Sequence, residues 1–243
     1  MPVTADTDTT APSLASPPAG AHAITLPCGT ALWLLPQRAV WWPAARMAFV
    51  ADVHFGKAAT FRRAGQPVPH GTTADNLARL DAVLAVTGAE HLVFLGDFLH
   101  ARSGAADALW QQLLPWRKRH AQLQMTLVRG NHDLHAGGPP PPLALAIVNE
   151  PWLPHADTPL LACHHPQAVV GHTVLAGHLH PTLRLNGPGR DSLRAPCFGW
   201  GEGQLVLPAF GAFTGTSPAA LPGTWVRFAV TPGRVVAVPA GFS

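Results

Sequence analysis

The chain has 243 residues, of which 47% are hydrophobic and only 12% charged, so it can bury a large core and is not disordered as a whole. Its formal net charge of +3 permits binding to nucleic acid without requiring it. The three cysteines lie far apart without a CxxC pair, which argues against a disulfide framework and fits a reducing compartment. No apolar run reaches about 18 residues, and the first twenty residues lack a secretory signal pattern. We therefore expect a cytoplasmic protein without membrane association.

The N-terminal segment differs in composition from the rest of the chain. Residues 1–22 are rich in Thr, Ala, Pro, Ser and Asp and have almost no large apolar side chains. Such a segment cannot bury enough apolar surface to fold. We predict a disordered tail here, followed by one domain over residues 23–243.

Hydrophobic periodicity predicts alternating strands and helices in the first half of the chain. A helix is expected from residue 72 to about 86, beginning at a capping box formed by Thr72 and Asp75. A second helix is expected at 105–120, and a surface loop at 137–142, where Gly and Pro follow one another. The expected strands are 31–35, 46–51, 91–95, 124–128, 145–148, 159–162 and 173–176, with a turn at 41–43 and several short strands between 183 and 238. This order indicates two packed sheets with helices outside, an α/β fold of the four-layer α-β-β-α sandwich type.

Five apolar runs, each typical of a short buried strand, end at side chains that bind metals. These are 49–51 before Asp52 and His54, 93–95 before Asp97, 126–128 before Asn131, His132 and Asp133, 160–162 before His164 and His165, and 174–176 before His178 and His180. Loops at the carboxyl ends of strands in layered α/β folds gather into one crevice where ligands bind. We therefore expect these side chains to share one site.

The mixture of side chains suits a pair of divalent ions. Two ions about 3.5–4 Å apart can clamp a phosphoryl group and convert a bridging water into hydroxide. Ions this close need a carboxylate between them, and neutral imidazoles complete each shell without adding charge. Mixed nitrogen and oxygen ligands favour Mn, with Fe or Zn as alternatives, over Mg or Ca. The sequence therefore predicts a metal-dependent hydrolase.

The order of the motifs resembles that of the calcineurin-like metallophosphoesterases. These proteins share Asp-x-His, Gly-Asp, Gly-Asn-His-Asp, a further His, and Gly-His-x-His. The ligands that the resemblance implies are Asp52, His54 and His180 for one ion, Asn131, His164 and His178 for the other, and Asp97 as the bridge between them. The resemblance also implies that His132 is a catalytic residue, able to donate a proton or hydrogen bond to the phosphoryl oxygen or the leaving group. Asp133 would fix the tautomer of His132.

One ligand position has an alternative. His164 and His165 are neighbours, and strand alternation points them to opposite faces. The family pattern of His, one residue and Pro favours His164, which leaves His165 packed or beside a ligand. Cys163 is interpreted as a small buried residue rather than as a thiolate ligand.

A narrower resemblance extends over roughly residues 30–217. It rests on the segments 52–57, 61–65, 68–72, 95–100, 194–198 and 207–215. These segments resemble the ligase-associated DNA-damage-response endonucleases among the bacterial calcineurin-like phosphoesterases. The resemblance implies that the partner is DNA, that the reaction belongs to DNA repair, and that the protein is associated with a DNA ligase and a helicase.

Several side chains are predicted to contact the substrate. Lys57, Arg62 and Arg63 follow the first ligand motif closely, so they can lie at the rim of the metal site and bind phosphates that flank the scissile one. The alternative is that they are charges on a solvated loop. His100 is predicted either to reach the substrate or to cap a loop. The basic run 117–120 is expected at a helix C-terminus, where the helix dipole stabilises cations.

The sequence is consistent with three functions to different degrees. The favoured one is hydrolysis of DNA phosphodiesters by an endonuclease with a dinuclear centre and a metal-bound hydroxide. The alternative is a phosphatase or phosphodiesterase that acts on a small nucleotide-like phosphoester through the same centre. The third is a non-catalytic scaffold in a repair complex, against which the complete ligand set argues. No interface stripe indicates an oligomeric state.

Overall fold

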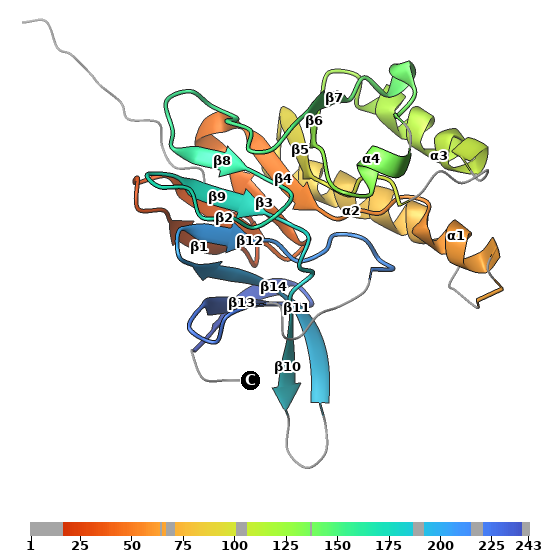
Figure 1. The fold of residues 1–243 in the computed structure, drawn as a ribbon. Coiled ribbons are helices and arrows are strands. Elements are labelled where there is room, and N and C mark those ends of the chain that lie inside the picture. Colours follow the sequence, from red (N-terminus) through yellow and green to blue (C-terminus); the bar gives the residue numbers. More distant parts are fainter. Residues whose placement is uncertain are drawn as a thin grey trace, which may run out of the picture.

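Two β-sheets pack face to face, and helices lie outside one of them (Figure 1). The sheets and helices are seen here in a computed structural model of the chain. The residues that it describes are 17–63, 65–66, 71–100, 106–136, 138–186, 192–214 and 221–239.

The first sheet has seven strands in sequence order. They are β1 (His22–Thr25), β2 (Ala31–Leu35), β3 (Ala39–Trp42), β4 (Met47–Ala51), β5 (His91–Leu95), β6 (Gln124–Val128) and β7 (Ala146–Val148). Strands β1 to β4 pair antiparallel, and β4 to β7 pair parallel. Because strands β4 to β6 are covered on both faces, they are apolar along nearly their whole length instead of alternating.

The second sheet is built from the C-terminal half of the chain. Its strands are β8 (Leu160–Ala162), β9 (Thr173–Ala176), β10 (Thr182–Asn186), β11 (Ser192–Gly201), β12 (Gln204–Val206), β13 (Val226–Thr231) and β14 (Arg234–Val238). Strands β8, β9 and β12 are parallel neighbours, while β10, β11, β13 and β14 pair antiparallel. The carboxyl ends of β8 and β9 therefore lie at one edge of this sheet.

The α-helices of the described residues all lie before residue 137. They are α1 (Lys57–Arg63), α2 (Thr72–Thr87), α3 (Ala106–Arg119) and α4 (Asp133–Ala136), with short 3-10 turns η1 (Pro43–Ala45) and η2 (Pro141–Leu143). Helices α2 and α3 cover the outer face of the first sheet, where Leu80, Trp116 and Phe94 are all buried in one core. None of these helices has the length and apolar character needed to cross a membrane.

A second core fills the space between the two sheets. Phe49 and Leu95 of the first sheet lie in one buried cluster with Leu175 and Phe198 of the second. The outer face of the second sheet buries a smaller cluster that includes Trp225. The structure therefore has the predicted α/β sandwich, although no α-helix among the described residues covers that outer face.

Several local predictions were wrong. Residues 41–42 lie in β3 and not in a turn, because Trp41 and Trp42 are buried on the two faces of the sheet. No side chain caps α2, since its N-cap is Gly71, whose carbonyl accepts the Asp75 N–H at 2.9 Å.

The predicted helices at 72–86 and 105–120 are confirmed as α2 and α3, and the predicted strands from 31–35 to 173–176 are confirmed as strands of the two sheets.

The predicted N-terminal tail lies mostly outside the described residues, which begin at residue 17. Ala21 packs against the core, and His22 is the first residue of β1. The division into a tail over residues 1–22 and a domain over residues 23–243 stays a prediction.

A buried asparagine on α2 joins this helix to two loops that follow strands. Asn76 is 4% exposed, its Nδ2 donates to the carbonyl of Val53 at 3.2 Å, and its Oδ1 accepts the Ala212 N–H at 2.8 Å. The loop after β4 and the loop after β12 are thus held by one side chain.

Replacing Asn76 with Ala should leave both backbone groups without a partner. Each unsatisfied buried group costs about 1–3 kcal/mol, so we expect Asn76→Ala to lower the free energy of unfolding by about 2–4 kcal/mol. Urea denaturation measures this change. Gln112→Ala, at an exposed amide on α3, is the matched control and should change stability by no more than about 0.5 kcal/mol. Equal effects of the two substitutions would contradict the role of Asn76.

Candidate metal centre

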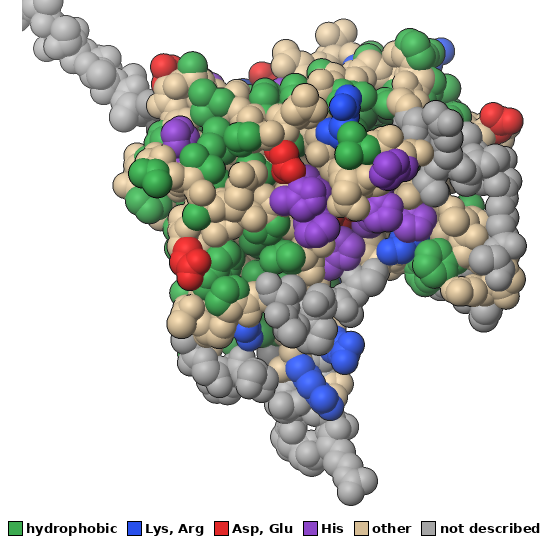
Figure 2. Space-filling model, viewed as in Figure 1, with side chains coloured by type: hydrophobic (Ala, Val, Ile, Leu, Met, Phe, Trp, Pro, Cys, Tyr) green, Lys and Arg blue, Asp and Glu red, His purple; other side chains and the backbone are tan. Residues whose placement is uncertain are grey.

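The five strand ends singled out in the sequence meet at one edge of the two sheets. Loops after β4, β5 and β6 of the first sheet lie beside loops after β8 and β9 of the second, and contacts between their side chains join them. Figure 2 shows histidine side chains gathered on this face of the molecule. The structure thus brings together the predicted ligands from both halves of the chain.

The first ligand set consists of Asp52, His54 and His180. Their ligand atoms lie within 4.8 Å of one another, and the Nε2 of His180 is 3.4 Å from the Oδ1 of Asp52. Atoms that each lie about 2.1 Å from one ion are roughly 3–4 Å apart, so this spacing fits a shared ion. Asp52 is fully buried, and its other oxygen accepts the backbone N–H of His178 at 2.9 Å.

The second ligand set consists of Asn131, His164 and His178. The Nε2 of His164 lies 2.9 Å from the Oδ1 of Asn131 and 3.0 Å from the Nδ1 of His178. The Nδ1 of His164 lies 3.1 Å from the carbonyl of Leu95, the type of contact that fixes the tautomer of a ligating histidine. In that tautomer the lone pair of His164 Nε2 points towards the Oδ1 of Asn131 and the Nδ1 of His178, so the three atoms could share one ion.

Asp97 lies between the two sets. Its Oδ2 is 3.6 Å from the Nε2 of His54, and its Oδ1 is 3.6 Å from the Nε2 of His164. One carboxylate therefore faces a histidine of each set with a different oxygen. This is the position that a bridging carboxylate needs.

The donor atoms fit metal ions on chemical grounds as well. Buried atoms without a hydrogen-bond partner include the Oδ1 of Asp52 and both ring nitrogens of His54. Burial lowers the pKa of His54 to about 2, with Lys57 adding to the effect, and burial also lowers the pKa of His178. Neutral imidazoles and unpaired buried carboxylate oxygens are the groups that a divalent ion would satisfy.

The backbone of the ligand loops is strained. Left-handed φ angles occur at five of the predicted ligands, which are Asp52 (54°), His54 (49°), Asp97 (48°), His178 (68°) and His180 (48°). Non-glycine residues adopt this region uncommonly, and each costs on the order of 1–3 kcal/mol. Such strain clusters at functional sites, and nothing in strand periodicity predicts it.

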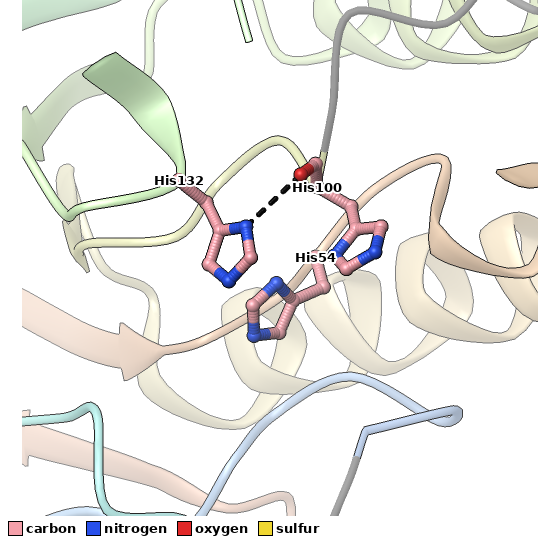
Figure 3. Close-up of side chains that lie close together, drawn as sticks. All are labelled: His54, His100 and His132. Carbon is pink, nitrogen blue, oxygen red and sulfur yellow. Dashed lines mark hydrogen bonds between the residues drawn. The ribbon is translucent and has the colours of Figure 1, made fainter. Parts of the chain in front are cut away.

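A group of three histidines lies beside the ligands. His54, His100 and His132 follow β4, β5 and β6, and their rings face one another in Figure 3. The rings of His100 and His132 stack with centroids 5.0 Å apart, and the Nε2 of His132 is 3.9 Å from the Oδ2 of Asp97. Burial, followed by Lys57, lowers the pKa of His100 to about 4. The structure thus brings His132 and His100 together beside the predicted ligand Asp97.

Asp133 does not make the predicted contact with His132. Its two oxygens accept the backbone N–H groups of Leu99 at 3.1 Å and Gly130 at 2.9 Å. The Nδ1 of His132 instead lies 3.1 Å from the carbonyl of His100. Asp133 therefore ties together the loops after β5 and β6, while a backbone carbonyl orients His132.

His164, and not His165, has the surroundings of a ligand. His164 is fully buried and faces Asn131, whereas the side chain of His165 is 44% exposed. The Nδ1 of His165 lies 2.6 Å from the Oε1 of Glu150. The geometry favours the same choice as the motif pattern.

Glu150 is a residue that sequence reasoning missed. Its Oε2 accepts the backbone N–H groups of His164 at 2.6 Å and His165 at 2.8 Å, so it holds the ligand segment in place. Burial alone would raise the pKa of this carboxyl, but the hydrogen bonds from both residues lower it. No spacing pattern links a turn residue to a segment 14 residues away.

Cys163 does not have the character of a ligand. It is buried with Leu161 and Val174, and burial raises the pKa of its thiol to about 11. Its sulfur accepts the side-chain N–H of Gln167 at 3.4 Å. The thiol is therefore a small core residue, as predicted.

The predicted substrate cations lie on helix α1, a segment for which the sequence predicted no helix. Lys57 is half-buried near the site, and burial lowers its pKa while Asp97 and Asp52 act in the opposite direction. Arg62 is exposed towards the other end of the helix, and the side chain of Arg63 lies outside the described residues. Lys57 is thus electrostatically coupled to Asp97 and Asp52.

The basic run 117–120 lies away from the centre. It occupies the last turn of α3, where Arg117 donates to the carbonyls of Leu143 and His120. Arg119 and His120 lie within 4.0 Å of Asp81 on α2. The interpretation as a helix C-terminus is confirmed.

Two packed sheets whose strand ends unite two sets of metal ligands define a metallophosphoesterase. A model of the calcineurin-like phosphoesterase family matches residues 45–194, and the chain belongs to this family. Among solved structures it is similar to the Pseudomonas putida nuclease MPE, at 44% identity over 90% of this chain and 100% of that chain, with a TM-score of 0.76. It is also similar to Yfce, a phosphoesterase from E. coli, at 17% identity over 80% of this chain and 98% of that chain, with a TM-score of 0.41. No curated protein sequence matches the chain.

Glycine at position 96 is required by the closeness of His164. A Cβ at Gly96 would lie 2.0 Å from the Nδ1 of His164, and the residue has a φ of 75°. We therefore expect Gly96→Ala to displace His164, lower stability by about 3–5 kcal/mol and reduce the bound metal. Metal analysis and thermal unfolding measure the two effects. Gly223→Ala, where a Cβ meets nothing within 4 Å, is the control. Normal metal content in Gly96→Ala would contradict this account.

Proposed function

We propose that this metal-dependent phosphoesterase hydrolyses phosphodiester bonds of DNA, as an endonuclease, through a dinuclear metal centre. The observation that carries the proposal is the position of Asp97 between two complete ligand sets, with His132 and His100 beside it. The nuclease character of the Pseudomonas putida relative supports a nucleic acid substrate. The similarity extends over the whole of that chain, which supports proposing nuclease activity for this protein too.

The ligand roles in the proposal follow the geometry. One ion would be held by Asp52, His54 and His180, the other by Asn131, His164 and His178, and Asp97 would join them. When bound, two divalent ions supply Lewis-acid charge to the phosphoryl group and lower the pKa of water. We propose Mn as the metal, with Fe or Zn as alternatives, because the donors mix nitrogen and oxygen.

His132 is the proposed catalytic residue outside the ligand sets. Its Nδ1 is oriented by the carbonyl of His100, so its Nε2 faces Asp97 and the space above the ligands. In its protonated form this nitrogen can donate to a phosphoryl oxygen or to the leaving group. Asp133 supports this position indirectly, because it holds the loop that carries His132.

The proposed substrate contacts are His100, Lys57, Arg62 and Arg63. His100 stacks on His132 and lies beside His54, so its imidazole is proposed to contact a phosphoryl oxygen at the site. Lys57 is near the carboxylates and would attract the phosphate electrostatically. Arg62 and Arg63 follow on the same helix and would meet phosphates further along the strand.

The biological setting belongs to the proposal as well. The resemblance to ligase-associated endonucleases suggests a role in DNA repair beside a DNA ligase and a helicase, in the cytoplasm. The alternative substrate is a small nucleotide-like phosphoester. An enclosed pocket at the ligands would favour that alternative, whereas the histidines lie on an open face (Figure 2).

Substrate preference separates the two functions. With Mn present, we expect cleavage of an oligodeoxynucleotide and of bis-p-nitrophenyl phosphate, and little release from p-nitrophenyl phosphate. Affinity for the oligonucleotide should fall steeply with salt, because phosphate contacts release counterions. Rates on the three substrates over a series of salt concentrations measure both effects. Preference for the monoester, or a response to salt that is flat, would overturn the nuclease proposal.

Two substitutions separate metal binding from catalysis. Asp97→Asn should abolish turnover and reduce metal content, because it weakens both ligand sets. His132→Ala should lower kcat by about 100- to 10,000-fold while the metal content stays near that of the parent. Metal analysis measures the metal content of the two variants, and kinetics on bis-p-nitrophenyl phosphate measure their turnover. Equal loss of metal in the two variants would contradict the assigned roles.

A further inference from the structure

A β-hairpin projects from the second sheet next to the metal centre. Strand β10 begins two residues after the ligand His180 and pairs antiparallel with β11, with Thr182 opposite Pro196. In Figure 1 the two strands extend beyond the rest of the sheet. The hairpin is thus rooted directly at the ligand loop.

Two arginines lie directly opposite each other on this hairpin. Arg184 pairs with Arg194 in the register of the strands, and both side chains are exposed. The neighbouring pair, Leu183 and Ala195, is buried on the other face of the hairpin. Like charges directly opposite on a sheet destabilise it, so this pair works against the stability of the hairpin.

Nothing acidic in the described part of the chain offsets the two charges. The one side-chain hydrogen bond of Arg184 goes from its Nη2 to the Oγ of Ser192 at 3.2 Å. Among the described residues, neither arginine lies within 4.0 Å of a carboxylate. Two exposed arginines at directly opposed positions, without a carboxylate of the described residues beside them, form a surface suited to an anionic partner.

The arginines lie on the same side of the molecule as the histidines. Figure 2 shows Lys or Arg side chains over the hairpin on the face that carries the histidine group, and Arg184 and Arg194 are the basic residues described in β10 and the paired part of β11. Arg184 is four residues beyond His180, about 13 Å at the rise of a strand. This distance corresponds to a few nucleotides of an extended strand.

We propose that the arginine pair of the β10–β11 hairpin binds the sugar–phosphate backbone of the nucleic acid strand, a few nucleotides from the phosphate that is cleaved. The inference rests on the proposed function and adds a second contact surface to it. Guanidinium groups bind phosphate oxygens through paired hydrogen bonds, and the contact reads no sequence. The charges that destabilise the free hairpin are then neutralised by the substrate.

The test is a double variant of the full chain loaded with Mn, Arg184→Ala with Arg194→Ala. For a long oligodeoxynucleotide we expect KM to rise about tenfold and the slope of log KM against log salt to fall by about 1.4–1.8, since each lost phosphate contact removes about 0.7–0.9. For bis-p-nitrophenyl phosphate, which is too small to reach the hairpin, kcat/KM should be unchanged. The melting temperature should be equal to or above that of the parent.

Two controls make the result specific. The double variant Lys118→Ala with Arg234→Ala removes the same net charge at exposed positions on α3 and β14. It should leave the kinetics on both substrates unchanged. Arg184→Lys with Arg194→Lys keeps the charge without the paired hydrogen bonds, and it should restore most of the salt slope but only part of the affinity.

The failure of this inference differs from failure of the proposed function. If the parent cleaves the long oligonucleotide and the alanine pair does so with the same KM and salt slope, the hairpin inference is overturned and the nuclease stands. If the parent hydrolyses bis-p-nitrophenyl phosphate but no oligonucleotide, the proposed function itself fails, and the inference fails with it. If the alanine pair instead loses binding to vesicles that contain phosphatidylserine while DNA kinetics are unchanged, the partner is an anionic membrane and the inference is overturned.

Discussion

Two carboxylates buried together are the constraint on which the site depends. Asp52 is fully buried and Asp97 is 3% exposed, and among the described residues the basic side chains within 4.0 Å of their oxygens are all histidines. Like charges held in a buried site are costly unless cations or protons neutralise them. Because burial keeps neighbouring imidazoles such as His54 neutral, the protein itself supplies little of that positive charge. The arrangement is therefore stable chiefly as a receptor for cations, which explains why the fold keeps two acids where packing alone would favour apolar side chains.

The rest of the fold serves to hold this arrangement against strain. Five of the proposed ligands have left-handed backbone angles, which can persist only where surrounding contacts determine them. Asn76 and Glu150 provide such contacts to the loops after β4 and β8. Arg38 and Arg79 donate to the carbonyls of Ala209 and Phe210, which adjoin the loop after β4. Side chains remote in the sequence thus hold the loops after β4 and β8 in place.

The difference between local sequence patterns and contacts between distant loops explains what the sequence could predict. Buried strands and the ligand types at their ends are local patterns, so the strand positions and the grouping of Asp52, Asp97 and His164 were predictable. The contact of Asp133 with backbone N–H groups, and that of Glu150 with the segment of His164, depends on how loops from different strands meet, and no local pattern encodes it. Helix α1 was missed for the same reason, because its short length gives little periodicity and it is held by contacts with the loops around it.

Under the proposed function, hydrolysis and the choice of substrate depend on different parts of the molecule. Burial lowers the pKa of His54 to about 2 and that of His100 to about 4, so these two imidazoles add no positive charge to the centre at neutral pH. Lys57 is coupled to the carboxylates, and ions held by them would add to the attraction of a phosphate at the reacting position. A centre of this kind would act on any accessible phosphodiester. Under the proposed function, discrimination between a long polymer and a small ester would then come from charges at a distance from the ions, such as the arginine pair of the β10–β11 hairpin.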